Sequence, residues 1–187
     1  MKPVNQVLET DWYQGNKAAA VVIVEYSDFQ CPACRLYSPL IEQLTQLYPD
    51  QLAVVYRHFP LKEIHPRANL AAQAAEAAGK QGKFWEMNHL LFERQEEWAE
   101  SGQASKIMMG YAQELGLNSD QFKQDLNSKA VKGLVKADYL SALANRLNGT
   151  PSFFVNGSRI ENPQGLAAFQ AVLEPLLPAT DSATISE

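Results

Sequence analysis

The stretch AAAVVIVEYSDFQCPAC, residues 18–34, decides how this chain folds. Residues 18–26 are β-branched and almost continuously apolar, which is typical of a strand that is buried on both faces, as central parallel strands are. Two cysteines, Cys31 and Cys34, follow shortly after and open a segment in which apolar residues recur every three to four positions. We therefore expect a central strand that is followed directly by a helix over residues 31–48.

The residues after this helix continue the alternating pattern. Pro49 ends the helix, and residues 52–59 (LAVVYRHF) predict a second strand. Two strands joined by a helix form a parallel unit with a right-handed crossover in nearly all proteins. Residues 65–147 then change character, because their Ala-rich and amphipathic segments favour helices. Within this block, Asn118 with Gln121 three residues later matches a helix cap, so a further helix is expected to begin there.

The C-terminal part predicts a hairpin and a last helix. Two short apolar segments flank Asn156-Gly157, a dipeptide that tolerates the positive φ of a two-residue turn, so an antiparallel β-hairpin is expected. Asn162 is expected to cap a final helix whose first residue is Pro163. Residues 179–187 form a terminal tail that we expect to be disordered.

Size and charge narrow the range of functions. The chain has 187 residues and a mass of 20.8 kDa, which suits a single domain with a substantial core. Its formal net charge is -5, so no broad basic surface is available for phosphates and no nucleic-acid partner is expected. The longest apolar run, residues 18–24, is far shorter than the roughly 20 residues that cross a bilayer, so no membrane insertion is expected. The N-terminus lacks a recognisable secretory signal, which predicts either a cytoplasmic protein or one whose signal has been removed.

The two cysteines carry the chemistry of the sequence. Cys31 and Cys34 are separated by Pro32 and Ala33, so both thiols share one face of the first helical turn and can form or open a disulfide without a change of fold. Unpaired amides and the helix dipole stabilise a thiolate at a helix N-terminus, so Cys31 is expected to be the nucleophile. Cys34 lies one turn further into the helix, and we expect it to keep its proton longer and to resolve the mixed disulfide.

Two simpler roles for the cysteines are a structural zinc site and a structural disulfide. A structural zinc site needs four ligands, and two cysteines with three scattered histidines do not supply them, so no metal site is expected. A structural disulfide over so short a loop would constrain the unfolded chain little.

Glu25 also needs an explanation, because an ionised carboxylate within an apolar strand is costly to bury and its pKa rises. From the residues alone, the solvated end of the strand is one place that would avoid this cost.

Four features together resemble the DsbA-like thiol-disulfide oxidoreductase family of the thioredoxin superfamily. These are the strand that ends in Glu25, the segment SDFQCPAC at residues 27–34, the long helix that follows, and GTPSFFVNG at residues 149–157. The resemblance covers nearly the whole chain. It implies an α/β thioredoxin fold, in which a central mixed β-sheet is flanked by helices and an all-helical subdomain is inserted.

The resemblance also implies the domain organisation. Residues 1–187 would form a single DsbA-like domain. Its thioredoxin core would comprise about residues 18–60 and 148–178, and the helical insertion about residues 61–147.

Individual residues take roles from the same resemblance. Pro151 would be the cis-proline that faces the two sulfurs, and the backbone of Thr150 would present an edge to which a substrate strand can add. Glu25 would lie beneath the active-site helix and accept the proton of the buried thiol. Pro39 would take the position of the kinking proline in that helix. The cofactor implied is none beyond the redox-active disulfide itself.

The implied activity is exchange of the Cys31–Cys34 disulfide with client proteins, and we expect a monomeric dithiol oxidase of oxidative protein folding. A disulfide isomerase or reductase of the same fold is the alternative, because Pro32-Ala33 lacks the histidine of strongly oxidising members and Thr150 occurs in members of several types. The family implies a membrane partner of the DsbB or vitamin K epoxide reductase type, and a periplasmic or cell-envelope location if a signal peptide has been removed. A peptide-binding module with inert cysteines and a Cu(I) or zinc chaperone remain as other classes.

Overall fold

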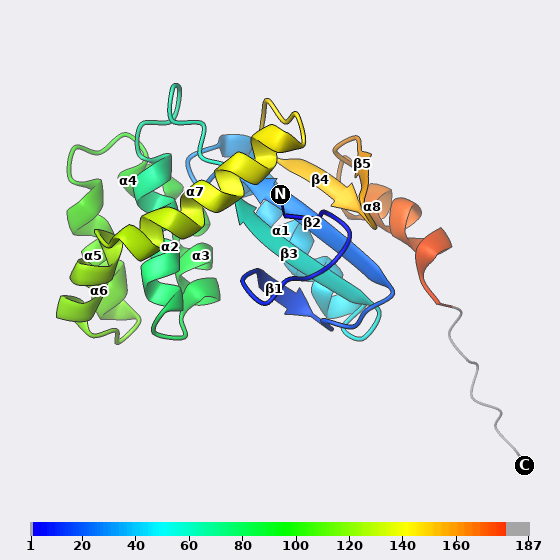
Figure 1. Cartoon of the computed structure of the whole chain (residues 1–187), viewed down its shortest axis with the longest axis horizontal. Helices are drawn as coiled ribbons and strands as arrows, with labels where there is room; N and C mark the ends of the chain where they lie inside the picture. Colours follow the sequence, from blue (N-terminus) through cyan, green and yellow to red (C-terminus); the bar gives the residue numbers. More distant parts are fainter. Residues whose placement is uncertain (1, 179–187) are drawn as a thin grey trace, which may run out of the picture.

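The computed structural model describes residues 2–178 and shows an α/β fold built on one mixed sheet (Figure 1). The five strands lie in the order β1-β3-β2-β4-β5. β2 and β3 pair in parallel, and the other neighbours are antiparallel. The predicted fold class is therefore confirmed. The strands comprise Trp12–Gly15 (β1), Val21–Ser27 (β2), Leu52–His58 (β3), Ser152–Val155 (β4) and Ser158–Ile160 (β5).

The central parallel unit forms as the sequence predicts. All residues of β2 and β3 are buried, because helices cover both faces of the sheet. The helix α1 (Pro32–Leu47) connects the two strands, and Pro39 lies inside it. Glu25 in β2 lies opposite Tyr56 in β3 in the parallel register, so the two side chains lie side by side on one face of the sheet.

The edge strand β1 is not predicted from the sequence, because its four residues are too few to show a strand pattern. It pairs with β3, with Trp12 opposite Tyr56. The sheet therefore begins before residue 18. Between β1 and β2, the Asn16 carbonyl accepts a hydrogen bond from the Ala19 N–H at 2.9 Å. This turn explains why β2 begins at Val21 rather than at residue 18.

Helices enclose the sheet on both faces. One set of alternate residues in β2 and β3 packs against α1 and α8 (Leu166–Leu173), and the other set packs against α7 (Lys129–Ala144). Figure 1 shows α7 crossing in front of the sheet and α1 behind it. Ile23 lies on the α1 face and Val24 on the α7 face. By the same alternation, Glu25 points toward the layer that contains the cysteines.

The predicted C-terminal hairpin is confirmed. Asn156 and Gly157 join β4 to β5 with φ values of 46° and 87°, the left-handed conformations that a tight hairpin turn requires. The Asn156 side-chain oxygen also accepts a hydrogen bond from the Val22 N–H at 2.8 Å. The turn is thereby anchored to the first residues of the central strand.

The last helix begins later than the sequence predicts. Residue Gly165 has a φ of 88° and turns the chain immediately before α8, so the prediction that Asn162 caps this helix and Pro163 opens it is wrong. The Asn162 side-chain amide instead donates a hydrogen bond to the Pro151 carbonyl at 2.9 Å. This contact ties the C-terminal segment to the loop before β4.

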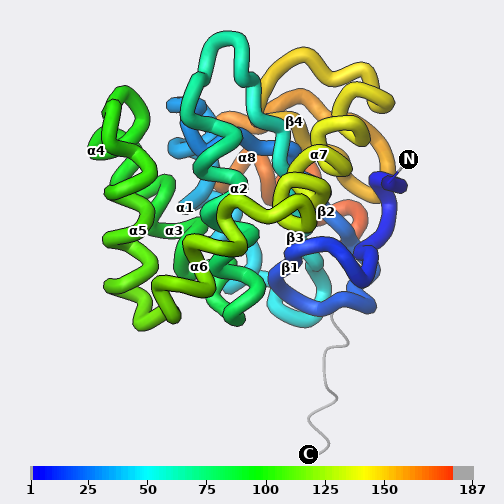
Figure 2. Tube along the Cα trace, turned by 60° about the vertical axis from the view of Figure 1, so that its left-hand side comes forward, coloured from blue at the N-terminus to red at the C-terminus, as the bar shows by residue number. Residues whose placement is uncertain are grey.

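Helices α2 to α7 separate β3 from β4 along the chain, and most of them stand beyond one end of the sheet (Figure 2). The predicted cap at Asn118 is confirmed, because its side-chain oxygen accepts a hydrogen bond from the Gln121 N–H at 2.9 Å. The remaining helices comprise Ala68–Gly79 (α2), Phe84–Glu93 (α3), Gln95–Trp98 (α4), Ala104–Glu114 (α5), Ser119–Leu126 (α6) and the short 3-10 turn Glu174–Leu176 (η1) after α8.

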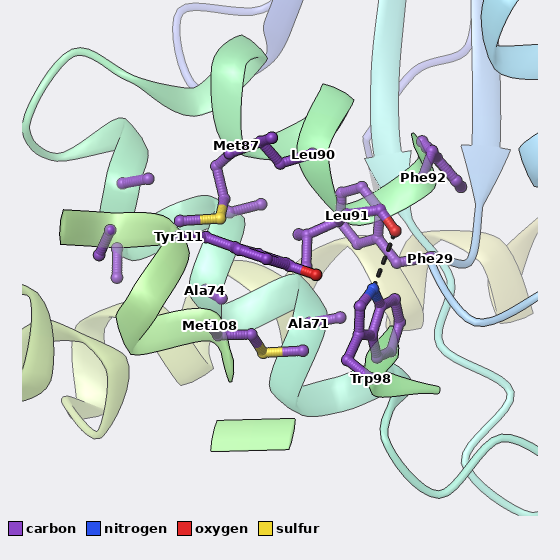
Figure 3. Packing of buried hydrophobic residues seen from close by; sticks show 14 of the residues in the cluster. Phe29, Ala71, Ala74, Met87, Leu90, Leu91, Phe92, Trp98, Met108 and Tyr111 are labelled. Atoms are coloured by element: carbon purple, nitrogen blue, oxygen red, sulfur yellow. Dashed lines mark hydrogen bonds between the residues drawn. The ribbon is translucent and has the colours of Figure 1, made fainter. Parts of the chain in front are cut away.

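The helical block packs around a hydrophobic core that also includes Phe29, Tyr56 and the two cysteines. Figure 3 shows part of this core. Trp98 is fully buried there, and its indole N–H donates to the Leu91 carbonyl at 2.9 Å. Phe29, from the loop after β2, packs on Phe92 of α3 with ring centroids 4.8 Å apart. The block therefore supports the segment that leads into the cysteines.

Two further predictions concern the ends of the chain and the bilayer. The disorder expected over residues 179–187 lies outside the described residues. Among the helices of residues 2–178, none combines the length and apolar character that a bilayer crossing needs.

Candidate active site

The two cysteines lie where β2 meets α1. Cys31 is the N-cap residue of α1, Pro32 is the first helical residue, and Cys34 follows within the first turn. Both are free thiols. No side chain caps the helix, so its first backbone N–H groups are left for the Cys31 sulfur. The transition from a buried strand to a helix thus places a pair of thiols at a helix N-terminus.

Cys31 lies at the outer side of this turn. It is 7% exposed, and its sulfur lies 3.5 Å from the Thr150 carbonyl oxygen, to which the thiol donates when it is protonated. A hydrogen bond with the Cys34 side chain lowers the pKa of Cys31 to about 5, with help from the Thr150 side-chain hydroxyl and the backbone N–H groups of Cys34 and Ala33, while burial opposes this shift. Cys31 is thereby a thiolate at neutral pH and a nucleophile.

Cys34 lies at the inner side and is fully buried. The Asp28 backbone N–H donates to its sulfur at 3.5 Å. Burial raises the pKa of Cys34 well above its usual range, and the neighbouring Cys31 and the charge of Glu25 raise it further, while the Ser27 hydroxyl opposes them. A thiol in this position keeps its proton until a base removes it.

Glu25 lies beneath the cysteines in β2, between Tyr56 in β3 and Phe153 in β4. Its side chain is buried, with the residue 3% exposed, so it does not lie at a solvated strand end. Burial raises the pKa of Glu25 to about 7, against the effect of the Ser27 hydroxyl. A carboxyl that titrates near neutral pH can both accept and return a proton.

The loop before β4 faces Cys31 from the other side. The Thr150–Pro151 peptide bond is cis. The Ser152 hydroxyl donates to the Gly149 carbonyl at 2.8 Å, and the Asn162 amide holds the Pro151 carbonyl. A cavity of about 550 Å³ adjoins this loop and is bounded on its far side by residues 159–162. The loop is thus fixed on one flank and open on the other.

Several residues that hold the active-site loop were not singled out from the sequence. The Gln95 side-chain amide, from α4, donates to the carbonyls of Phe29 and Cys31 at 2.6 and 3.1 Å. Nothing near Gln95 in the sequence indicates this contact, because the two segments meet only in the folded chain. Gln30 likewise donates to the Ala99 carbonyl at 2.8 Å. The helical block thus fixes the backbone on which Cys31 sits.

Asp28 holds the loop between β2 and α1 in place. It is buried, and its carboxylate accepts hydrogen bonds from the N–H groups of Gln30 and Leu61 at 2.7 and 2.8 Å. The same carboxylate lies 2.7 Å from the His65 Nδ1. His65 therefore helps to hold the loop. No group of three or more potential metal ligands occurs within residues 2–178.

The family follows from a comparison of the whole chain with known proteins. Residues 7–175 match the family model described as Thioredoxin. The chain belongs to the thioredoxin family. Among solved structures, a thioredoxin-like oxidoreductase from Silicibacter pomeroyi is 27% identical, with a TM-score of 0.75 over 90% of this chain and 92% of the other.

DsbA proteins share the same fold. The α-DsbA1 of Wolbachia pipientis has a TM-score of 0.79 at 23% identity, covering 91% of this chain and 92% of the other. BdbD of Bacillus subtilis has a TM-score of 0.80 at 19% identity, covering 92% and 96%. The fold is therefore that of DsbA-like thioredoxin-family proteins.

The curated relatives are longer proteins. Na(+)/H(+) antiporter NhaA 3 of Salinispora tropica is 38% identical over 92% of this chain and 25% of its own length. Na(+)/H(+) antiporter NhaA 1 of Mycolicibacterium vanbaalenii is 41% identical over 93% of this chain and 27% of its own length. The chain thus spans about a quarter of the length of the curated relatives that it matches.

Proposed function

We propose that this chain is a thiol-disulfide oxidoreductase that exchanges a Cys31–Cys34 disulfide with client proteins. The observation that carries this proposal is the pairing of a thiolate-stabilising position at the start of α1 with a buried thiol one turn inward, beside a buried carboxyl. We assign the exchange to the residues of this chain, whatever further segments the longer relatives contain.

The chemistry proceeds through a mixed disulfide. When the active-site disulfide is closed, a client thiolate attacks the Cys31 sulfur, the Cys31–Cys34 bond breaks, and Cys34 leaves with the proton of Glu25. A second client thiolate then attacks the client sulfur of this mixed disulfide, which forms the client disulfide and releases Cys31 as a thiolate. Two electrons thus pass from two client thiols to the cysteine pair. The reverse sequence reduces a client disulfide, with Glu25 accepting the proton of Cys34.

The direction we propose is oxidation. Whatever stabilises the Cys31 thiolate stabilises the reduced protein, and a stabilised reduced form makes the disulfide a stronger oxidant. The Cys34 thiol, the Thr150 side-chain hydroxyl and the helix N–H groups all favour the thiolate. Isomerisation or reduction is the alternative, since Pro32-Ala33 adds no further charge or donor of its own. The equilibrium potential separates these roles.

The clients we propose are unfolded or folding proteins with free cysteines. An extended client segment can lie along the Thr150 backbone, with the cavity of about 550 Å³ beside it leaving space for client side chains. An oxidant of this kind works in an oxidising compartment, so we propose a periplasmic or cell-envelope location. A membrane redox partner of the DsbB or vitamin K epoxide reductase type would reoxidise the pair. Cys31, Cys34, Glu25, Thr150 and Pro151 are the residues that would carry the exchange.

The test is an equilibrium titration in glutathione buffers, followed by oxidation of a reduced, unfolded disulfide protein in the presence of catalytic amounts of this chain. We expect a potential well above that of thioredoxin and rapid client oxidation. Cys31→Ser cannot form the disulfide, so it should show neither a redox transition nor client oxidation. A potential near that of thioredoxin would indicate a reductase or isomerase. Slow alkylation of Cys31 at neutral pH would favour a binding module, and tight thiol-dependent binding of Cu(I) or zinc in equilibrium dialysis would favour a metal chaperone.

A further inference from the structure

The outer face of α7 carries a stripe of lysines that continues into leucines. Lys129, Lys132 and Lys136 are followed at the same spacing of three or four residues by Leu140 and Leu143, and all five residues are exposed. Residues at this spacing lie on one face of a helix. The opposite face of α7 packs against the sheet. The helix thus presents a basic half and an apolar half to solvent.

Two adjoining cavities lie beside this stripe, between α7, α2 and the loop that joins β3 to α2. The first has a volume of about 320 Å³ and is lined by Lys62 from the loop and by Lys132, Lys136 and Leu140 from α7. The second has a volume of about 230 Å³ and shares Lys62 and Tyr139 with the first. These two cavities together form the α7 groove. Its lysines therefore surround a concave space, which is the usual shape of a ligand site.

The floor of the α7 groove is apolar. The rings of Phe59 and Tyr139 pack with centroids 5.5 Å apart, and both residues line the second cavity. Ile64 lines the same cavity and is 69% exposed. The Ile64 N–H donates to the Leu61 carbonyl at 3.0 Å, which holds this part of the loop in a turn. The groove thus joins an apolar second cavity to a basic first one.

The lysines of the first cavity have no acidic partner in the described part of the chain. No ion pair within residues 2–178 engages Lys62, Lys132 or Lys136. The one carboxylate among the described residues that line the groove is that of Glu63, in the second cavity. The whole chain has a formal net charge of -5, so this local excess of positive charge runs against the overall balance. Charge complementarity therefore favours carboxylates of a partner at the first cavity.

The second cavity borders the active-site loop. The Leu61 N–H, beside this cavity, donates to the Asp28 carboxylate at 2.8 Å. Asn148 also lines the cavity and precedes Thr150 by two residues, and the Thr150 carbonyl lies 3.5 Å from the Cys31 sulfur. Figure 2 shows the loop between β3 and α2 and the loop before β4 at the same end of the molecule. A peptide in the α7 groove therefore points its apolar end toward the active site.

We infer that the α7 groove binds an acidic, extended segment of a client protein, with client carboxylates at the three lysines of the first cavity and client apolar side chains over the second. The inference rests on the proposed function for the identity of this partner as a client. Binding in the groove raises the local concentration of a client cysteine near Cys31. Clients in which acidic residues are followed by apolar residues and then by a cysteine are thereby preferred.

A peptide fits this surface better than an anionic bilayer does. A bilayer takes up apolar side chains and basic groups that project from a protein surface. The lysines of the first cavity instead surround a hollow, which the separate side chains of an extended peptide can enter. The closeness of the second cavity to the active-site loop also suits a client that must reach Cys31.

The first experiment measures binding of a short fluorescent peptide by anisotropy. In the peptide, a run of glutamates is followed by leucines and by a serine in place of the client cysteine. Lys132→Gln/Lys136→Gln removes two charges from the groove. Lys106→Gln/Lys123→Gln is the matched control, because these exposed lysines lie outside the groove, on α5 and α6.

The affinity for this peptide should fall about tenfold in the groove variant, as the loss of two exposed ion pairs implies, and by less than about twofold in the control. Added salt should weaken wild-type binding. Peptides with glutamines for glutamates, or with serines for leucines, should bind the wild type less tightly, because each lacks one half of the recognised pattern.

The second experiment connects binding with exchange. The wild type and the groove variant each oxidise two reduced peptides that contain a pair of cysteines, one after the acidic and apolar run and one after a run with glutamines. We expect the groove variant to raise KM for the acidic peptide by about tenfold and to leave kcat unchanged, because these lysines contact neither sulfur. The neutral peptide should be oxidised equally by both proteins.

Equal affinity of the wild type and the groove variant for the acidic peptide would overturn the inference. So would a wild type that binds phosphatidylglycerol vesicles through these lysines but not the peptide, since the surface would then be a membrane contact. Failure of the proposed function gives a different pattern. A wild type that binds the acidic peptide through these lysines and oxidises neither client peptide would refute thiol exchange, while supporting a site for acidic segments.

Discussion

On the outer side of the active site, the Cys31 sulfur lies against the Thr150 carbonyl at the start of α1, close to solvent. On the inner side, the Cys34 sulfur is fully buried beside Glu25. The two thiols are three residues apart, yet the pKa of Cys31 falls to about 5 and that of Cys34 rises well above its usual range. The difference shows that position within one helical turn, not residue type, decides which sulfur attacks and which one waits for a base.

The strongest way to break this comparison is to exchange the sulfurs one at a time. Cys31→Ser should abolish thiol exchange and rapid alkylation, because a serine hydroxyl is not ionised near neutral pH. Cys34→Ser should keep rapid alkylation at Cys31 but accumulate mixed disulfides with clients, since the resolving thiol is gone. Mass spectrometry of trapped species and iodoacetamide kinetics measure both. Equal behaviour of the two variants would contradict the assignment.

The inner side is tested next by Glu25→Gln, which removes the proton acceptor and keeps the shape of the side chain. Resolution by Cys34 should slow by about 10²-fold at pH 7, within the range of general acid–base catalysis. Initial attack at Cys31 should stay close to wild type, because that thiolate needs no base. Stopped-flow measurement of the two steps separates them, and equal slowing of both would contradict a role confined to Cys34.

Glu25→Gln should slow resolution by Cys34 and yet stabilise the folded protein. Glu25 has a pKa of about 7 in the folded protein against an ordinary value of 4.5, so between these values the folded state holds a proton that the unfolded state has lost. Stability contributed by this group is therefore present below pH 4.5 and is lost as pH rises through 7. The loss is about 3 kcal/mol by the shift alone.

Glu25→Gln should consequently stabilise the reduced protein by up to about 3 kcal/mol at pH 8, and by little below pH 4.5. Denaturant unfolding of the two reduced proteins at both pH values measures this difference. A gain of the same size at both would show that folding does not raise the pKa of Glu25.

The outer side depends on a contact from the helical block. Gln95→Ala leaves the Phe29 and Cys31 carbonyls without their donor, which should cost about 1–3 kcal/mol of stability. The exposed Gln113→Ala should change stability by less than about 0.5 kcal/mol. The rate of alkylation of Cys31 should change in Gln95→Ala, while Cys34 stays unreactive. A Gln95 variant as stable as the Gln113 control would show that the loop does not depend on this contact.

The smallest effect is expected at Thr150. Thr150→Val keeps the shape and the backbone carbonyl but removes the hydroxyl, so the pKa of Cys31 should rise by less than in Cys34→Ala, which removes the largest contribution to its lowering. The pKa of Cys34 should not change. Thiolate absorbance against pH compares the two variants. A larger rise in Thr150→Val would show that Thr150, and not Cys34, contributes most to the low pKa of Cys31.

The sequence could predict the features that are local. The apolar run before Cys31 predicted β2, the spacing of the two cysteines predicted their common face on α1, and Asn118 and Asn156 predicted a cap and a turn. Each of these depends on neighbours within a few residues. Local chemistry was therefore predictable before the fold was known.

Contacts between distant segments could not be predicted in this way. Gln95 reaches the active-site loop from α4, and Tyr56 meets Glu25 only through strand register. The local signal at Asn162 and Pro163 was misleading, because Gly165 turns the chain before the helix can begin. The parts of the site that surround the cysteines thus required the fold, whereas the cysteines themselves did not.

The most direct test of the opposite environments is a carbon NMR titration of both cysteine Cβ atoms in the reduced protein. Cys31 should titrate with a midpoint near 5, and Cys34 should remain protonated beyond pH 9. Two thiols that titrate together at the value of an ordinary cysteine, or a Cys34 that ionises first, would contradict the assignment of Cys31 as nucleophile and Cys34 as resolving thiol.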